Sequence, residues 1–300
     1  MQTTIKLIQV YYHVCDKYNE LLRWEVQRFS QNNLKGEITD EEIITIYLFC
    51  VAYEEKYKIK SMYNHIKKYW LTWFPQLPSY QTFTARLNRL SEAFHLLVEE
   101  LMKSLTLPCD SLPVMLGDSM PVITCSHKRA GKVAPQLTDK GYCATKGIHY
   151  YGIKIHALAL RQPGKLPQPQ YLGITPASVH DLTALRPVLE KTKACASILD
   201  KAYCDAALEK LMAQNNNQLI TPMKNKKGLA TALQHFDEAA QNIFNSAISK
   251  IRQPIESLFN WINEHTLIQN ASKVRSEKGL IVHVFGRLAA ALLLLANFNS

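Results

Sequence analysis

Three acidic residues lie where a fold could bring their carboxylates together. Asp118 and Asp200 each end a short apolar run, at 113–118 and 196–200, and Glu256 lies in a later segment with helical spacing. Carboxylate oxygens are the ligands that hard cations such as Mg²⁺ prefer, and two such ions can activate an attacking oxygen and stabilise a leaving one. One acid after an apolar run is usually a turn residue or a helix cap. Three in this arrangement favour a metal site for phosphodiester chemistry.

The 300-residue chain is basic, with a net charge of +10 and an isoelectric point near 9.2. Residues 1–112 hold 13 Lys/Arg and 13 Asp/Glu, whereas residues 113–300 hold 22 and 12, so the excess lies on the side of the candidate acids. The stretch 121–180 alone holds eight basic residues and one acidic residue, Asp139. A basic surface beside carboxylates indicates a polyanion such as nucleic acid as the partner. A solvated basic face is the other interpretation.

Basic residues near these acids are candidates for contacts with DNA phosphates. The segment 126–141 is predicted to be a long basic loop between strands, and long loops in structured domains are often functional. His156 shares one face of a predicted strand with one of the candidate lysines. For each candidate the other interpretation is structural: a cap, a satisfied strand histidine or a surface ion pair. The predicted DNA-binding residues are Lys128, Arg129, Lys132, Lys154, Lys201 and Arg252.

The cysteines and the apolar segments favour a cytoplasmic protein. The seven cysteines include no Cys-x-x-Cys, which favours reduced thiols over disulfides or a zinc site. No signal peptide is evident at the N-terminus. The apolar stretch 280–298 is interrupted by His283, Gly286 and Arg287, which leaves less than the ~20 residues that a membrane span needs. A buried C-terminal helix is therefore predicted, with no membrane partner.

Residues 1–112 are predicted to form an all-α N-terminal region. Within it, the segments 58–74 and 80–90 resemble a helix-turn-helix, although a small helical bundle gives the same pattern. DNA binding and a purely structural role therefore both stay open for this region. The stretch 106–113, with two prolines, is the predicted boundary. The polar side chains expected to be exposed on the second helix are Gln81, Thr84, Arg86 and Arg89.

Residues 113–300 are predicted to form an α/β domain. The predicted strands are 114–116 (leading to Asp118), 149–160, 170–175, 196–200 and 218–221, and the predicted helices are 181–191, 205–214, 236–249 and 251–264, before the apolar C-terminal helix. The resulting order, β-β-β-α-β-α-β-α, is that of an RNase H-like domain, a mixed β-sheet flanked by helices. In that topology the first and fourth strands are neighbours, so their C-terminal ends bring Asp118 and Asp200 together, and a helix carrying Glu256 can lean across.

Five motifs in this order resemble a known family. They are 116–122 (LGDSMPV), 150–156 (YYGIKIH), 175–181 (TPASVHD), 199–203 (LDKAY) and 251–261 (IRQPIESLFNW). Together they resemble the DDE transposases encoded by small bacterial insertion sequences, which have an RNase H-like catalytic core. The resemblance covers most of the chain.

The resemblance implies a role for each of the three acids. Asp118, Asp200 and Glu256 would be the catalytic and metal-binding triad, holding two Mg²⁺ or Mn²⁺ ions. The protein would bind the terminal inverted repeats of its element, cleave the element ends and transfer the 3′-OH ends to target DNA. A homodimer or a larger synaptic complex is expected because two DNA ends must be joined. The expected location is the bacterial cytoplasm, in association with the nucleoid, and no small-molecule substrate is expected.

The sequence departs from many relatives at two positions around Glu256. Relatives carry a Tyr where this chain has Ser249 and a Lys where it has Asn263, so another base such as Lys273 or Arg275 would have to make the phosphate contact of that Lys. Two other functions therefore stay open. One is a metal-dependent nuclease with the same core and no strand transfer, and the other is a catalytically inactive, DNA-binding transposase remnant.

Overall fold

The structure is a computed structural model, and it describes residues 2–26, 38–105, 112–126, 133–143, 146–223 and 231–298. The chain forms two compact units that interleave in sequence. The helical unit comprises Met1–Leu105, Ile123–Thr138 and Ile262–Ser300, and the sheet unit comprises Thr106–Val122 and Asp139–Trp261. The predicted domain boundary at residue 112 stays a prediction.

The sheet contains parallel and antiparallel strands in the order β2-β3-β1-β5-β6, with β4 also paired to β3. The strands are β1 (Val114–Ser126), β2 (Asp139–Cys143), β3 (Ile148–Leu160), β4 (Gln168–Pro176), β5 (Ala196–Ile198) and β6 (Gln218–Ile220). β1, β5 and β6 run parallel, while β2 and β4 are antiparallel to β3. This mixed α/β architecture, preceded by helices, confirms the predicted fold class and is consistent with an RNase H-like core.

Two strands differ from the prediction. β1 continues for eight residues beyond Asp118, and β2 lies at the end of the segment predicted to be a loop. β2 has the sequence Asp-Lys-Gly-Tyr-Cys, which lacks the alternation that identifies a strand, and it forms because β3 offers it an edge. β2 pairs with residues 148–152 and β4 with residues 153–160, so both lie along one edge of β3.

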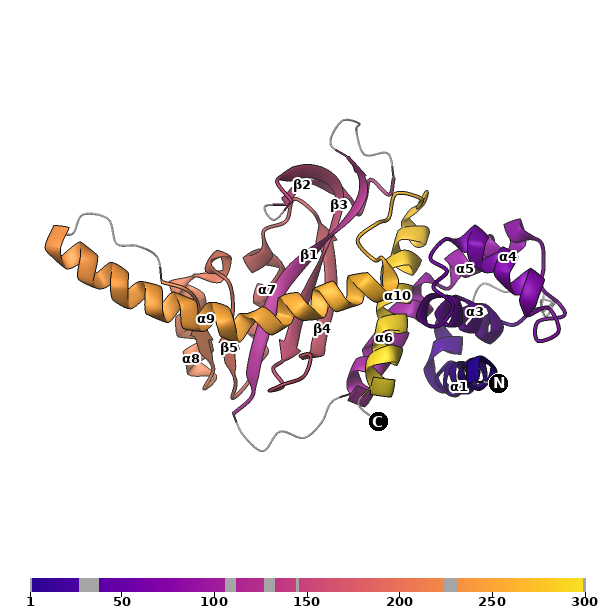
Figure 1. Ribbon diagram of the computed structural model, residues 1–300, viewed down its shortest axis with the longest axis horizontal. Helices are drawn as coiled ribbons and strands as arrows, with labels where there is room; N and C mark the ends of the chain where they lie inside the picture. The colour runs from indigo at the N-terminus through magenta and orange to yellow at the C-terminus, as the bar shows by residue number, and fades with distance from the viewer. Residues whose placement is uncertain are drawn as a thin grey trace. The chain divides into compact units, whose positions relative to one another are not determined.

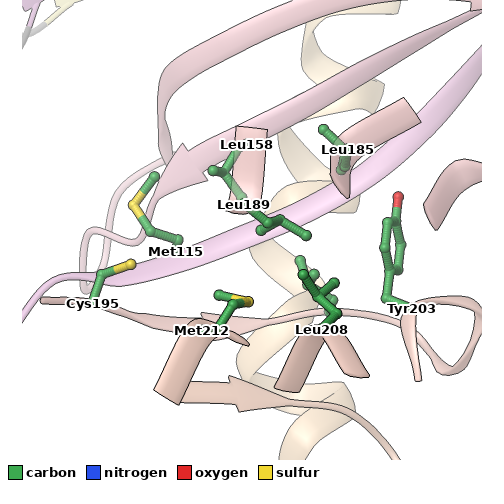
Figure 2. Close-up of a cluster of buried hydrophobic side chains, with 9 residues drawn as sticks. Met115, Leu158, Leu185, Leu189, Cys195, Tyr203, Leu208 and Met212 are labelled. Carbon is green, nitrogen blue, oxygen red and sulfur yellow. The ribbon is translucent and has the colours of Figure 1, made fainter. Parts of the chain in front are cut away.

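Two helices bury a hydrophobic cluster against the sheet. These are α7 (Asp181–Leu189), capped by the His180 side chain, and α8 (Ala206–Gln214), whose first turn is capped by Asp205. Burying a Leu side chain stabilises a fold by about 1.5–3 kcal/mol, so this cluster anchors both helices. Figure 2 shows most of its side chains, which are Met115, Leu158, Leu185, Leu189, Cys195, Leu199, Tyr203, Leu208 and Met212.

Helix α9 (Thr231–Thr266), which lies in the sheet unit as far as Trp261, is continuous where two helices are predicted at 236–249 and 251–264. Pro254 lies inside it, where a proline removes one hydrogen bond and its ring crowds the carbonyl of the preceding turn, so packing must offset this cost. Ile255 and Leu258 of this helix are fully buried, and their packing keeps the helix continuous past Pro254. Figure 1 shows α9 as one long helix that runs across the sheet.

The helical unit is a bundle in which α10 packs against α6 and α3 (Figure 1). By length and composition the stretch Glu277–Ala296 is apolar enough to cross a membrane, but 83% of its most apolar window is buried inside the structure. Such burial is that of a core helix, as predicted. The helices are α1 (Gln2–Lys17), the π-helical turn η1 (Tyr18–Leu22), α2 (Arg23–Val26), α3 (Asp40–Ala52), α4 (Ile59–Tyr69), α5 (Tyr80–Arg89), α6 (Ser91–Leu105) and α10 (Glu277–Phe298).

Candidate active site

Two neighbouring parallel strands bring Asp118 and Asp200 to the same edge of the sheet. Leu116 of β1 is in register with Ile198 of β5. Asp118 lies two residues after Leu116, and Asp200 lies two residues after Ile198. Gly117 allows this close approach, because a Cβ atom at that position would lie 2.5 Å from the Leu199 side chain. The predicted adjacency of these two strands is therefore confirmed.

Arg252 joins the two aspartates. Its guanidinium lies 3.3 Å from a carboxylate oxygen of Asp118 and 3.5 Å from one of Asp200. The arginine is buried, while the Asp200 side chain is half exposed. Both distances are long for charge-assisted hydrogen bonds, which usually measure about 2.7–2.9 Å. The cation between the carboxylates is thus held loosely.

Burial raises the pKa of Asp118 to about 6. The backbone N–H of Ser119, which donates to Asp118 at 2.8 Å, and the Arg252 guanidinium both act against this rise, while the charges of Asp200 and Glu256 add to it. Glu256 is exposed on α9, one helical turn after Arg252, and is close enough to act on the Asp118 charge. Three negative groups therefore share one electrostatic site.

Asp200 also organises the chain that follows it. Its side chain accepts a hydrogen bond from the Lys201 N–H at 2.6 Å and caps the short 3₁₀ turn Lys201–Tyr203. This turn directs the Lys201 side chain to solvent and buries Tyr203. Burial raises the pKa of Tyr203, and the charges of Asp181, Asp118 and Asp200 raise it further. The tyrosine thus lies within electrostatic reach of the aspartate pair.

The donor chemistry of this site fits a hard divalent cation. Asp118 and Asp200 supply carboxylate oxygens that already share one cation, the guanidinium, and Glu256 adds negative potential. Among the described residues, no three His, Cys, Asp or Glu side chains are grouped closely enough to enclose a metal ion. Asp118 and Asp200 thus both contact Arg252, while Glu256 lies one helical turn further along α9.

A second polar cluster lies on the β3–β4 hairpin. Lys154 donates to the Asp181 carboxylate and to the Val179 carbonyl, each at 2.9 Å. His156 is buried and lies 2.7 Å from the Thr175 hydroxyl, and burial lowers its pKa to about 4. Sequence reasoning missed Asp181 as the partner of Lys154, although both flank the same hairpin. The predicted contact of Lys154 with DNA stays a prediction, and in this structure the ammonium group is engaged.

The remaining basic candidates lie in different settings. Arg86, expected to be exposed on the helix-turn-helix, is instead half-buried and paired with Asp40 at 2.6 Å, because α3 packs beside α5. Arg275 donates to two neighbouring carbonyl groups, and the Asn263 side chain accepts from a backbone N–H. Three of the predicted DNA-binding residues lie outside the described residues: Lys128, Arg129 and Lys132.

The sequence of the chain matches one protein family. The family profile described as "Transposase DDE domain" matches residues 111–294, more than half of the chain. The protein is therefore a member of the DDE transposase family, whose members act on DNA and normally use divalent metals. Neither the curated proteins nor the solved structures gave a match to this chain.

Proposed function

We propose that this protein transposes an insertion sequence: it binds the terminal inverted repeats, cleaves the element ends and joins the freed 3′-OH ends to target DNA. The observation that carries the proposal is the pairing of Asp118 and Asp200 at adjacent strand ends, with Arg252 between them and Glu256 one turn further on. In a chain with a transposase DDE domain, this grouping of acids supports phosphodiester chemistry at this site.

Asp118, Asp200 and Glu256 are the residues that would hold the metal ions, Mg²⁺ or Mn²⁺. When bound, such ions lower the pKa of an attacking water and neutralise charge on the phosphate in an in-line displacement. The half-exposed Asp200 and the exposed Glu256 leave room for a DNA phosphate beside them. Bacterial origin and a nucleoid-associated location belong to the same proposal.

The proposed reaction has two steps. In the first, a water oxygen attacks the phosphorus at the element end, the P–O3′ bond breaks, and the products are a 3′-OH and a 5′-phosphate. In the second, that 3′-OH oxygen attacks a phosphodiester of the target, forming a new P–O bond as the target's 3′ oxygen leaves. The proton of each nucleophile passes to solvent, each leaving 3′ oxygen takes up a proton from solvent, and no protein–DNA bond is formed.

Arg252 and Lys201 are proposed to contact the phosphate backbone. The Nε–H of Arg252 has no partner among the described residues, and its guanidinium is held only by long contacts. Lys201 extends to solvent directly beside Asp200. Positive groups at these positions would attract the scissile phosphate and stabilise the charge that develops on it.

A strand-transfer assay with precleaved ends separates this proposal from a nuclease. A labelled duplex that ends in the element's terminal repeat with a free 3′-OH is incubated with a target plasmid and Mg²⁺. We expect joined product for the wild type and its loss for Asp118→Asn, Asp200→Asn and Glu256→Gln. Asp205→Asn is the matched control, because an asparagine still caps α8. Cleavage of uncleaved ends without any joining would contradict transposition and favour the nuclease.

A further inference from the structure

The charge of the N-terminal region is strongly partitioned. Residues 1–112 are neutral as a whole, yet residues 56–91 hold seven Lys/Arg and no Asp or Glu. The rest of that region holds all thirteen acidic residues and six basic ones. Asp40 pairs with Arg86 from outside this segment, but the other six basic residues still give it a local positive charge that attracts a polyanion. Its basic residues are Lys56, Lys58, Lys60, Lys67, Lys68, Arg86 and Arg89.

Helix α4 presents part of this charge on one face. Lys60, Asn64 and Lys67 are exposed and lie four and seven residues apart, which places them on one side of a helix. Met62 and Ile66 are fully buried on the opposite side. No ion pair between described residues involves Lys60, Lys67 or Lys68. The ammonium groups of this face are therefore available to an external anion.

Large apolar side chains are exposed just after these lysines in the sequence. The exposed fractions of Tyr69 and Trp73 are 62% and 46%, and Leu71 between them is also exposed. The backbone that carries them is well anchored, because Trp70 packs edge-on against Phe49 at 5.1 Å and Phe74 is buried. The exposure of these aromatic rings thus belongs to an ordered surface rather than to a chain end.

Aromatic rings among ammonium groups fit the chemistry of a strand with unpaired bases. A base stacks on an aromatic ring by its face, while the phosphates next to it contact lysines. A base inside a duplex has both faces covered by its neighbours, so stacking of this kind requires an unpaired base. The Nζ atom of Lys68 lies 4.9 Å from the ring centroid of Tyr69, so a positive charge and a stacking surface are adjacent here.

We propose that Lys60, Lys67, Lys68, Tyr69 and Trp73, the α4 surface, bind DNA that carries unpaired bases. The inference rests on DNA being the partner of this protein, but not on the roles of the three acids. The α4 surface lies in the helical unit, whereas the aspartate pair lies in the sheet unit. The ligand class is a single strand, such as the one exposed where an element end is opened.

The test is a binding measurement without metal. The full-length protein is titrated, in EDTA, against a fluorescein-labelled single strand of about 16 nucleotides and against a duplex of the same sequence, and fluorescence anisotropy is recorded. Tyr69→Ala and Trp73→Ala should each weaken binding of the single strand about tenfold. Binding of the duplex should change much less. Changing Lys67 and Lys68 together to Ala should reduce the slope of log K against log salt by about 0.7 for each phosphate that is no longer neutralised.

Matched controls lie on other surfaces of the same unit. Tyr12→Ala removes an aromatic side chain that is 75% exposed on α1, and Lys103→Ala removes an exposed lysine of α6. Both should leave binding unchanged, and thermal melting checks that every variant is folded. Equal weakening by Trp73→Ala and Tyr12→Ala, or equal weakening of single-strand and duplex binding, would overturn the proposal. A protein that binds in this way but cleaves nothing would contradict the proposed function alone.

Discussion

Two buried arginines, one in each unit, have opposite surroundings. Arg287 of α10 donates to the carbonyl oxygens of Thr266, Leu267 and Tyr57 at 2.6–2.7 Å. Arg252 of α9 lies between two carboxylates, at 3.3 and 3.5 Å. The first is held by short bonds to neutral backbone groups, and the second by long contacts to charged side chains.

This contrast separates a structural role from a functional one. The carbonyls around Arg287 belong to the backbone, so they cannot reorient without moving helix ends, and burial lowers the pKa of this guanidinium. Arg252 instead balances charges that would otherwise repel each other, since the charges of Asp200 and Glu256 add to the rise that burial causes in the pKa of Asp118. An ion pair with long contacts can be exchanged for a phosphate or a metal ion, whereas the Arg287 bonds cannot be exchanged without loss of packing.

The largest expected effect is on stability, at Arg287. Arg287→Met should lower the free energy of unfolding by about 3–5 kcal/mol, because three carbonyl groups lose their donor in a buried or partly buried setting. Urea denaturation followed by circular dichroism measures the change. A decrease below about 1 kcal/mol would show that the carbonyls find other partners. It would contradict the structural role that distinguishes Arg287 from Arg252.

Arg252→Gln should cost less stability and more activity. We expect a decrease of about 1–2 kcal/mol in unfolding free energy and a decrease of about 100-fold or more in DNA cleavage. The variant should also gain more thermal stability from Mg²⁺ than the wild type does, because no guanidinium competes for the two carboxylates. Thermal melting with and without MgCl₂ measures this gain. An equal gain in both proteins would mean that Arg252 does not occupy the cation position.

Two tightly packed glycines extend the comparison. A Cβ at Gly117 would lie 2.5 Å from Leu199, and one at Gly286 would lie 2.5 Å from the Tyr47 ring. Each Gly→Ala change should cost about 1–2 kcal/mol through overpacking. Only Gly117→Ala should also reduce cleavage, because Leu199 directly precedes Asp200. Equal cleavage by the two variants at a temperature where both are folded would argue against a closely positioned aspartate pair.

The smallest expected effect is the pH dependence of His156. Its folded pKa of about 4 is below the ~6.5 of an unfolded histidine, so the unfolded chain takes up the proton first. The stability from neutral His156 is complete above pH ~6.5 and is lost as the pH falls toward 4. His156→Gln should reduce the stability lost between about pH 7 and 5.5 by about 1 kcal/mol. Burial lowers the pKa of His283 to about 3, so this histidine should make stability depend on pH in the same direction. An unchanged pH profile for His156→Gln would assign the acid sensitivity to other groups.

Much of the fold follows from local pattern. The apolar runs before Asp118 and Asp200 predict the two central strands, and Ser79 and His180 cap helices where the sequence predicts helix starts. β2 could not be predicted, because its polar sequence depends on an edge that β3 supplies. The continuity of α9 through Pro254 likewise depends on tertiary packing that offsets a missing hydrogen bond.

Only part of the candidate active site can be predicted from the sequence. The spacing of Arg252 and Glu256 on one helix places both on the same side, but nothing in the sequence indicates that the guanidinium lies between the two aspartates. The pairing of Lys154 with Asp181 is set by the β3–β4 register, in which Lys154 lies opposite Thr175, and 27 residues separate the pair in sequence. Contacts made across strands need the register, which a single sequence does not supply.

The most direct test compares two aspartates five residues apart in the sequence, Asp200 and Asp205. A labelled duplex that carries the terminal repeat is incubated with Mg²⁺ and wild type, Asp200→Asn or Asp205→Asn protein. We predict cleavage at the repeat end by the wild type and by Asp205→Asn, and a decrease of at least about 100-fold with Asp200→Asn. Cleavage by Asp200→Asn at the wild-type rate would contradict the account, because the candidate active site would then not perform the chemistry.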